Sequence, residues 1–228
     1  MTVRVRVRLL YRSNSRILLT SALVLLLLTG GCGKLLYFFW PFGRTVTIPA
    51  QFDGLKNRSV AVVVFAPEST QFEYPWAVLN LSALTSARLR AGVKGITTID
   101  PQKINAYQHK NRHWVEMDRT ALGKALDADF VLYVSLVEFS TVEEGYVDLL
   151  RGRINGEIKV YDCSKSEDVA CVWTCDNIRV KFPKTATVRT ARNEADIHSI
   201  IMVKFSEKLA RKFHSYKVDR EKLNKEDL

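Results

Sequence analysis

Two segments of this chain are apolar on both of their alternating faces, and they constrain its fold more than any other feature. Residues 59–65 read SVAVVVF, and residues 130–139 read FVLYVSLVEF. A strand with this pattern has to be covered on both sides of its sheet, which is the position of the central strands in α/β proteins. We therefore expect the two strands to lie side by side at the centre of one sheet.

Helical patterns alternate with these strands along the chain. Apolar residues recur at three- and four-residue steps over residues 74–91, and again from about residue 193 to residue 216. Asp100 starts a second, polar helix, and Asp118 caps a third over residues 118–126, because a short side-chain oxygen accepts from the free N–H groups of a first turn. This order predicts an α/β fold: a three-layer, sandwich-like mixed sheet with helices on both faces.

An antiparallel hairpin is expected in the second half of the chain. Residues 151–161 alternate between apolar and polar, which is typical of a strand with one face in water, and residues 169–182 return across the polar turn 164–168. Gly152 and Gly156 lie on the apolar face, where glycine more often marks a bulge or a closely packed helix than a ligand site. The predicted core takes the apolar positions of all these segments: Val62, Val64, Leu84, Leu132, Val134, Ile158, Val180, Ile201 and Phe205.

The N-terminus has the three-part pattern of a secretory signal. Five arginines and no acidic residue lie within the first 16 residues, and an apolar run follows from Ile17 to Leu28. That run has 12 residues, whereas a membrane-spanning helix needs about 20. We expect residues 1–31 to be a signal peptide, and these residues carry half of the net charge of +10.

Residues 28–32 (LTGGC) resemble a bacterial lipobox, in which a cysteine thiol after small residues carries a diacylglycerol. Gly31 and Cys32 match, while the third position before the cysteine departs from the preferred Leu, Val or Ile. The resemblance implies that Cys32 is lipidated and holds the domain on the periplasmic side of a bacterial membrane. Gly33 in place of an acidic residue favours the outer membrane. The alternatives are a plain signal peptide cut after Gly31 or Gly33, and an uncleaved anchor that continues into residues 35–42.

The lipidated cysteine would open a membrane-proximal linker over residues 32–57. Its aromatic side chains can lie in the lipid headgroup region or can pack on the domain, and the sequence leaves both open. A single α/β domain over residues 58–215 and a charged, flexible tail over residues 216–228 complete the predicted organisation. The aromatic residues of the linker are Tyr37, Phe38, Phe39 and Trp40.

A second resemblance concerns the domain. Residues 122–132 (LGKALDADFVL) are similar to a signature of bacterial envelope α/β domains, and residues 60–67 are similar to their opening strand. This group comprises the curli-secretion lipoproteins, the penicillin-binding-protein activator lipoproteins and the amino-terminal domain of the Tol-system propeller protein. The resemblance spans about residues 58–215 and implies the fold and an envelope setting more than an activity. Asp127 departs from the group, which usually has Gly there.

Three cysteines follow Cys32. Cys171 and Cys175 lie four residues apart in a predicted strand, so their Cα atoms should be about 13 Å apart, too far for a disulfide. In an oxidising periplasm the expected pair is Cys163 with Cys171 across the turn, which leaves Cys175 as a thiol. A zinc site would need a fourth ligand and tighter spacing, and we favour it less.

No motif points to catalysis or to a cofactor. His109 and His113 have a spacing that can hold a metal on one helix face, but the residues between them offer no carboxylate, which favours a solvated helix end. The sequence has no nucleophile elbow, phosphate-binding glycine loop or zinc-protease helix. It also lacks basic runs with interleaved aromatic residues. We therefore expect no catalytic residue, no metal, no cofactor and no nucleic-acid partner.

Two classes of function remain from the sequence. The first is a membrane-tethered, non-enzymatic envelope module that binds or assembles another protein, whose identity the sequence does not give. The alternative is a structural subunit of an outer-membrane secretion channel, which the curli resemblance would imply, with the predicted hairpin as its membrane-spanning part. Another copy of this chain is a further candidate partner. A hydrolase is the least favoured class, because no local pattern supports it.

Overall fold

The computed structural model describes residues 45–219. The chain divides into two compact units, one over Ile48–Tyr216 and one that holds the two ends of the chain. The predicted signal peptide, Cys32 and the aromatic linker residues lie outside the described residues. The predicted domain of residues 58–215 lies within the larger unit.

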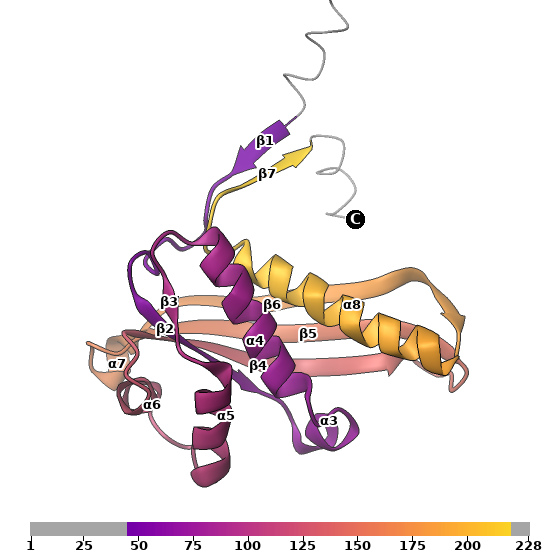
Figure 1. The fold of residues 1–228 in the computed structure, drawn as a ribbon, viewed down its shortest axis with the longest axis horizontal. Coiled ribbons are helices and arrows are strands. Elements are labelled where there is room, and N and C mark those ends of the chain that lie inside the picture. Colours follow the sequence, from indigo (N-terminus) through magenta and orange to yellow (C-terminus); the bar gives the residue numbers. More distant parts are fainter. Residues whose placement is uncertain (1–44, 220–228) are drawn as a thin grey trace, which may run out of the picture. The chain divides into compact units, whose positions relative to one another are not determined.

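The larger unit is built on a five-stranded mixed sheet with the strand order β3-β2-β4-β5-β6 (Figure 1). β2 pairs in parallel with β3 and with β4, whereas β4, β5 and β6 pair antiparallel. The strands span Ser59–Phe65 (β2), Thr97–Thr98 (β3), Phe130–Val142 (β4), Leu149–Asp162 (β5) and Cys171–Val188 (β6). The predicted neighbours β2 and β4 are confirmed, and β4 is the middle strand of the sheet.

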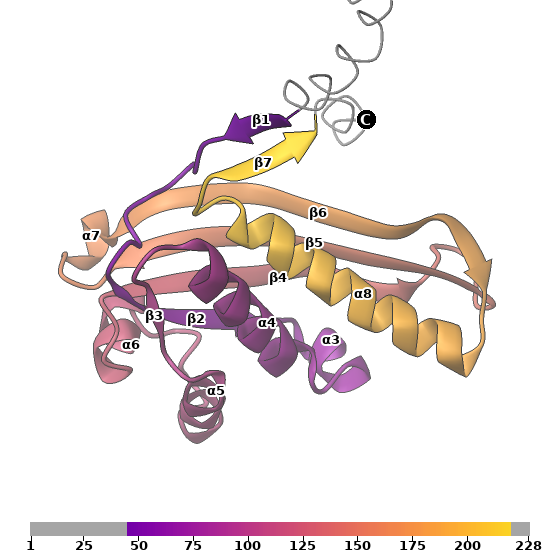
Figure 2. The same ribbon diagram turned by 45° about the horizontal axis from the view of Figure 1, so that its top comes forward.

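Helices cover both faces of this sheet, which confirms the predicted α/β, three-layer architecture. α4 and α8 lie over one face (Figures 1 and 2), and α5 and α6 contribute to the core on the other. The helices span Glu68–Glu73 (α3), Ala77–Gly92 (α4), Pro101–Lys110 (α5), Arg119–Ala125 (α6), Glu167–Ala170 (α7) and Ala191–Ala210 (α8).

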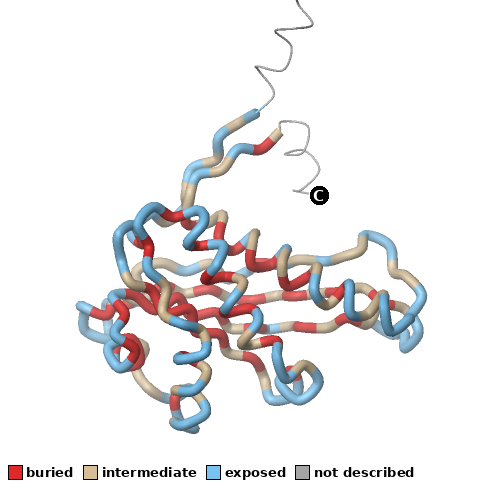
Figure 3. Tube along the Cα trace, viewed as in Figure 1, coloured by how far each residue is buried: buried red, intermediate tan, exposed pale blue. Residues whose placement is uncertain are grey.

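The apolar residues of β2 and β4 divide between two cores. Val62 and Leu132 face α4 and α8, while Val63 and Val131 face α5 and α6, and all four are fully buried. Figure 3 shows the buried residues concentrated along the sheet. Seven of the nine predicted core residues are buried, and the other two, Leu84 and Val180, are partly buried against the first core.

The glycines of β5 let α8 approach the sheet closely. A Cβ atom at Gly152 would lie 2.9 Å from Ile197 Cγ2, and one at Gly156 would lie 2.9 Å from Phe205 Cζ. Real Cβ contacts of that length do not occur without displacing a neighbour. Close packing of a helix, which the sequence favoured over a ligand site, is thus the role of both glycines.

The sequence predicted where α5 and α6 start, but it placed the start of α4 too early. Asp100 accepts from the N–H of Gln102, and Asp118 accepts from the N–H groups of Thr120 and Ala121. The helix expected from residue 74 begins only at Ala77, because Pro75 lacks an N–H group and pushes the residue before it towards an extended conformation.

Asp127 adopts a conformation that usually belongs to glycine. Its φ angle is 59°, in the left-handed region, which glycine adopts most readily because it has no Cβ atom. Aspartate is one of the few other residues that tolerates the region. The exposed Asp127 carboxylate also lies 3.3 Å from Lys103 Nζ.

β1 and β7 pair in a two-stranded sheet, and all but one residue of each strand belong to the second unit. β1 spans Thr45–Ile48 and β7 spans Tyr216–Asp219. The sequence predicts a last helix up to Tyr216 and a flexible tail beyond it, whereas α8 ends at Ala210 and Tyr216 begins a strand. β7 has only four residues, and only Val218 among them is buried. So short a segment has no recognisable periodicity in the sequence, and its distant partner β1 is needed to identify it as a strand.

Within residues 45–219, no helix has both the length and the apolar character that crossing a membrane requires.

Replacing Leu132 with Ala should destabilise the domain by about 2–5 kcal/mol, because the substitution opens a cavity in the middle strand. Val137→Ala on the same strand is the matched control, since Val137 is 56% exposed, and it should change stability by less than about 0.5 kcal/mol. Urea unfolding of both variants measures the difference. Equal midpoints for Leu132→Ala and the wild type would contradict the central placement of β4.

Candidate functional site

Three connections of the larger unit meet at one end of its sheet. We call it the hairpin end after the β4–β5 turn that lies there, and it is not the end with the turn of the β5–β6 hairpin. The three connections are the α3–α4 connection, the β4–β5 turn over residues 143–148, and the β6–α8 connection over residues 189–190. Tyr74 of the first lies with its hydroxyl 3.0 Å from Thr141 Oγ1 at the end of β4. The Thr141 hydroxyl in turn donates to Glu194 Oε1 at 3.5 Å on α8. Polar contacts thus join segments that are far apart in the sequence.

Arg189 connects α8 to the β4–β5 turn. Its guanidinium donates to both carboxylate oxygens of Glu194, at 2.8 and 3.1 Å, and to the Val147 carbonyl at 3.2 Å. The Arg189 N–H donates to the Asp148 carbonyl at 2.8 Å. A bidentate arginine–carboxylate pair has a fixed geometry, so the turn and the start of α8 are held in one arrangement.

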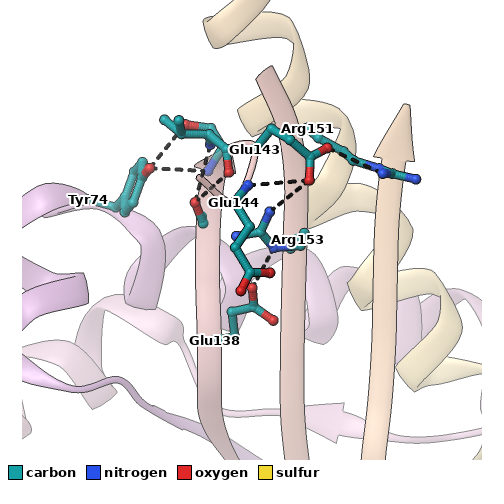
Figure 4. A network of polar contacts seen from close by, with 9 residues as sticks. Tyr74, Glu138, Glu143, Glu144, Arg151 and Arg153 are labelled. Carbon is teal, nitrogen blue, oxygen red and sulfur yellow. Dashed lines mark hydrogen bonds and ion pairs between the residues drawn. The ribbon is translucent and has the colours of Figure 1, made fainter. Parts of the chain in front are cut away.

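A second set of ion pairs lies on β4 and β5 beside this end (Figure 4). Arg153 Nε is 2.5 Å from Glu138 Oε1, and Arg153 Nη1 is 3.6 Å from Glu143 Oε1. Arg151 Nη1 is 3.2 Å from Glu143 Oε2, and its Nη2 donates to the Lys184 carbonyl at 2.6 Å. The Arg153 and Glu143 side chains are only 12% and 18% exposed, so the pair that they form is shielded from solvent more than an ordinary surface pair is.

Aromatic packing completes the hairpin end. The Tyr74 ring stacks on His198 at 5.5 Å between centroids and an interplanar angle of 19°, and it packs against Phe139 at 4.7 Å. Burial raises the pKa of Tyr74 and lowers the pKa of His198, because removal from water disfavours the charged form of each group. His198 is therefore an uncharged part of the packing at neutral pH.

Five large apolar side chains of this end are exposed, and we call them the apolar group. Phe72 is 91% exposed and Trp76 is 68% exposed, and they lie two residues before and two residues after the fixed Tyr74 in the sequence. Tyr146, Val147 and Val188 are 60%, 74% and 66% exposed, and the last two adjoin Arg189. A rigid base that presents aromatic side chains to solvent is an arrangement suited to binding another macromolecule.

The sequence did not single out the apolar group. Phe72 and Trp76 lie within the segment FEYPW, where the helix expected over residues 74–91 includes Trp76 and begins just after Phe72. The break at Pro75 turns Tyr74 inward and leaves its aromatic neighbours outside. Only the proline could have signalled this change of direction.

The cysteines of the hairpin are free thiols in the structure. Cys163 is buried beside Gly123, Cys171 is exposed at the start of β6, and Cys175 is partly buried. Burial, with a smaller effect from Asp162, raises the pKa of the Cys163 thiol to about 11. Pairing of Cys163 with Cys171 after export stays a prediction.

The two histidines with metal-ligand spacing do not share a helix. His109 is in the last turn of α5, which ends at Lys110, whereas His113 lies beyond it with Nδ1 3.5 Å from Glu116 Oε2. Over residues 45–219, no group of three or more His, Cys, Asp and Glu side chains is placed to hold a metal ion.

A cavity of about 250 Å³ lies at the opposite end of β4. Both acidic residues that line it have structural contacts: Asp129 Oδ2 accepts from the Ser59 N–H at 2.8 Å, and Asp162 Oδ1 accepts from the Ser164 N–H at 3.0 Å. The hydrogen bonds from Ser59 lower the pKa of Asp129, which is therefore charged at neutral pH. These contacts fix the start of β2 and the end of β5. The lining is formed by Arg58, Lys124, Ala128, Asp129, Phe130, Asp162, Cys163 and Ser164.

Comparison with known proteins gives structural likeness only. No protein-family model matches the sequence, and no curated protein sequence matches it. Among solved structures, the PelC dodecamer from Paraburkholderia phytofirmans is 15% identical over 73% of this chain and 96% of that chain, with a TM-score of 0.40. Lipoprotein GNA1162 from Neisseria meningitidis is 14% identical over 65% of this chain and 97% of that one, with a TM-score of 0.39.

A minor lipoprotein from Acinetobacter baumannii is 8% identical over 68% of this chain and 90% of that one, with a TM-score of 0.33. The similar structures thus include bacterial lipoproteins, although TM-scores this low indicate only a loose likeness in the arrangement of elements. Nothing in them ties the chain to the curli-secretion, penicillin-binding-protein activator or Tol group, and that resemblance stays a prediction. Any function has to be proposed from the chain's own residues.

The domain should lose stability below neutral pH through His198. Because burial lowers the folded-state pKa of His198, the unfolded chain binds the proton first as the pH falls. The stability that this group contributes is full above the ordinary histidine pKa of about 6.5 and is lost as the pH falls through the lowered value. Melting temperatures between about pH 8 and pH 5 should therefore fall more steeply for the wild type than for His198→Gln. Parallel curves for the two proteins would show that His198 is not shielded.

Proposed function

We propose that this chain is a lipid-anchored, non-enzymatic module of the bacterial cell envelope that binds another protein through the apolar group at its hairpin end. The observation that carries the proposal is the exposure of Phe72 and Trp76, two residues before and two residues after a fixed Tyr74 in the sequence. Aromatic side chains dominate the energetics of protein interfaces, and a preformed base lowers the entropic cost of binding.

Charge around the apolar group indicates what kind of partner fits. Glu68 and Glu73 are exposed next to Phe72, and Glu144 and Asp148 are exposed in the turn that carries Tyr146 and Val147. Acidic residues would repel an anionic lipid surface. The group therefore suits a protein with an apolar depression and a basic rim, in which the aromatic side chains are buried and the acidic ones are paired.

The anchoring part of the proposal rests on the N-terminal sequence. Cys32 after Gly31 would carry the lipid, and the aromatic residues Tyr37, Phe38, Phe39 and Trp40 would reinforce the attachment at the membrane surface. Two or three acyl chains hold a protein stably, whereas one binds reversibly. With Gly33 at the next position, we propose the outer membrane, with the domain in the periplasm.

The alternative, a subunit of an outer-membrane secretion channel, has less support. A membrane-spanning hairpin needs one face free for lipid and the other free for a water-filled lumen. The apolar face of β5 and β6 packs instead against α8, with Gly152 and Gly156 fitted to that helix. We therefore prefer the protein-binding module.

A photo-crosslinking amino acid at position 72 should yield one discrete heterologous adduct in envelope membranes, because this side chain would be buried in the partner. Position 169 is the matched control, since Val169 on α7 is 60% exposed and lies outside the apolar group. The adduct should disappear in Trp76→Ala, whose melting temperature should stay near that of the wild type. Crosslinks of equal yield from positions 72 and 169, or none from position 72, would contradict the proposal.

Cys32→Ser should abolish lipidation and release the protein from the membrane fraction, because the thiol is the only attachment point for the lipid in the proposed signal. Intact mass of the wild type should include the lipid and begin at Cys32. Membrane fractionation of both forms provides the comparison. If the wild-type protein has no added lipid mass, or if Cys32→Ser is processed identically, the N-terminus is not lipidated. It is then a plain signal peptide or an uncleaved anchor.

A further inference from the structure

A second surface lies on the face of the β5–β6 hairpin that points away from α8, and we call it the open face. Ile154 and Val180 pair across the two strands and belong to the core beneath α8. Side chains alternate along a strand, so their neighbours in sequence lie on the other face. Arg153 is paired there with Lys181, and Asn155 with Arg179. Arg151 continues the β5 row of the open face.

The open face has an excess of positive charge. Arg179 and Lys181 are exposed, and within the described part of the chain no carboxylate forms an ion pair with either. Arg151 and Arg153 share two carboxylates, those of Glu138 and Glu143. Arg153 and Lys181 have like charge in directly opposite positions, which is unfavourable in an isolated sheet. An anionic group above the sheet would remove that repulsion.

Three successive open-face residues of β5 also have a polar atom without a hydrogen bond. These atoms are Arg151 Nε, Arg153 Nη1 and Asn155 Oδ1, and all three are buried. Arg153 Nη1 has its ion pair with Glu143 Oε1 at 3.6 Å, whereas Arg151 Nε and Asn155 Oδ1 have no hydrogen-bond partner. Nearly all buried polar atoms of folded proteins are hydrogen-bonded, so these atoms indicate an incomplete set of contacts. Figure 4 shows the two arginines of this row beside Glu138, Glu143 and Glu144.

We propose that the open face binds an acidic segment of a partner protein in an extended conformation. An extended chain places side chains on one side about every 6.8 Å, which is the spacing of successive open-face residues along β5 and β6. Carboxylates at that spacing would pair with Arg179 and Lys181, and a carboxylate above β5 would accept from Arg151 Nε once that side chain turns towards it. The segment's own N–H groups supply the donor that Asn155 Oδ1 lacks, which the phosphates of a nucleic acid or a lipid do not.

The test uses the purified full chain in detergent and a fluorescent peptide of about 12 residues that alternates Glu with Ser. Fluorescence anisotropy should show binding that weakens as salt is raised from about 50 to about 300 mM. A block peptide of the same composition, with all Glu residues consecutive, should bind at least about fivefold more weakly, because its carboxylates do not match the spacing. A peptide that alternates Lys with Ser should not bind.

Arg179→Glu with Lys181→Glu should weaken binding of the alternating peptide by at least about tenfold. The matched control reverses Lys110 and Arg112, which are also exposed, two residues apart and without an ion pair in the described residues. This control makes the same change in net charge and should leave the affinity within about twofold of the wild type. Arg179→Gln with Lys181→Gln keeps the surface polar, and its melting temperature separates loss of binding from loss of folding.

Several outcomes would overturn the proposal. The first two concern the variants: Arg179→Glu with Lys181→Glu leaves the affinity unchanged, or reversal of Lys110 and Arg112 weakens binding equally. The other two concern the peptides: the alternating peptide binds no better than the block peptide, or it does not bind at all. If a DNA duplex or anionic vesicles bind more tightly than the alternating peptide, and Arg179→Glu with Lys181→Glu weakens that binding too, the open face binds phosphate groups instead. Phe72→Ala with Trp76→Ala should bind the peptide normally, so failure here is distinguishable from failure of the proposed protein-binding role of the apolar group.

Discussion

The fold depends on the parallel pairing of β2 with β4. The six residue pairs from Val60 with Phe130 to Phe65 with Ser135 join two strands that are buried on both faces. One face of this pair organises the core under α4 and α8, and the other organises the core under α5 and α6. Because burial of apolar surface is the dominant favourable term in folding, both layers of helices depend on this strand pair for their position. The antiparallel extension through β5 and β6 then needs a cover on one face only.

The sequence was sufficient to predict those elements in which burial of one or both faces imposes a regular spacing of apolar residues. Apolar residues on both faces predicted β2 and β4, strict alternation predicted β5, and aspartates predicted the starts of α5 and α6. It was insufficient where the outcome depends on distant contacts. The strand at Tyr216–Asp219 exists through its pairing with Thr45–Ile48, and four residues have no period of their own. The hairpin end was missed for the same reason, since the position of Tyr74 depends on Thr141, which is 67 residues away.

The larger unit thus combines two chemically different surfaces. The hairpin end offers aromatic side chains among acidic residues, and the open face offers basic residues on a flat sheet. The ion pairs of Arg151 and Arg153 with Glu138 and Glu143 lie where these surfaces meet. Glu143 belongs to the turn that carries Tyr146 and Val147, while both arginines belong to the β5 row whose buried polar atoms lack hydrogen bonds. A ligand that drew Arg151 or Arg153 towards itself would loosen their contacts with the turn, which gives a physical route from one surface to the other.

The long separation between β2 and β4 also determines when the domain can form during synthesis. A chain that emerges from its N-terminus exposes SVAVVVF about 70 residues before its partner strand becomes available, as the contact of Ser59 with Asp129 shows. A segment of this kind, rich in valine and without charge, is prone to pair with other chains while it waits. Until residues 130–142 have emerged, β2 lacks the strand that covers its longer paired edge and stays exposed to such contacts.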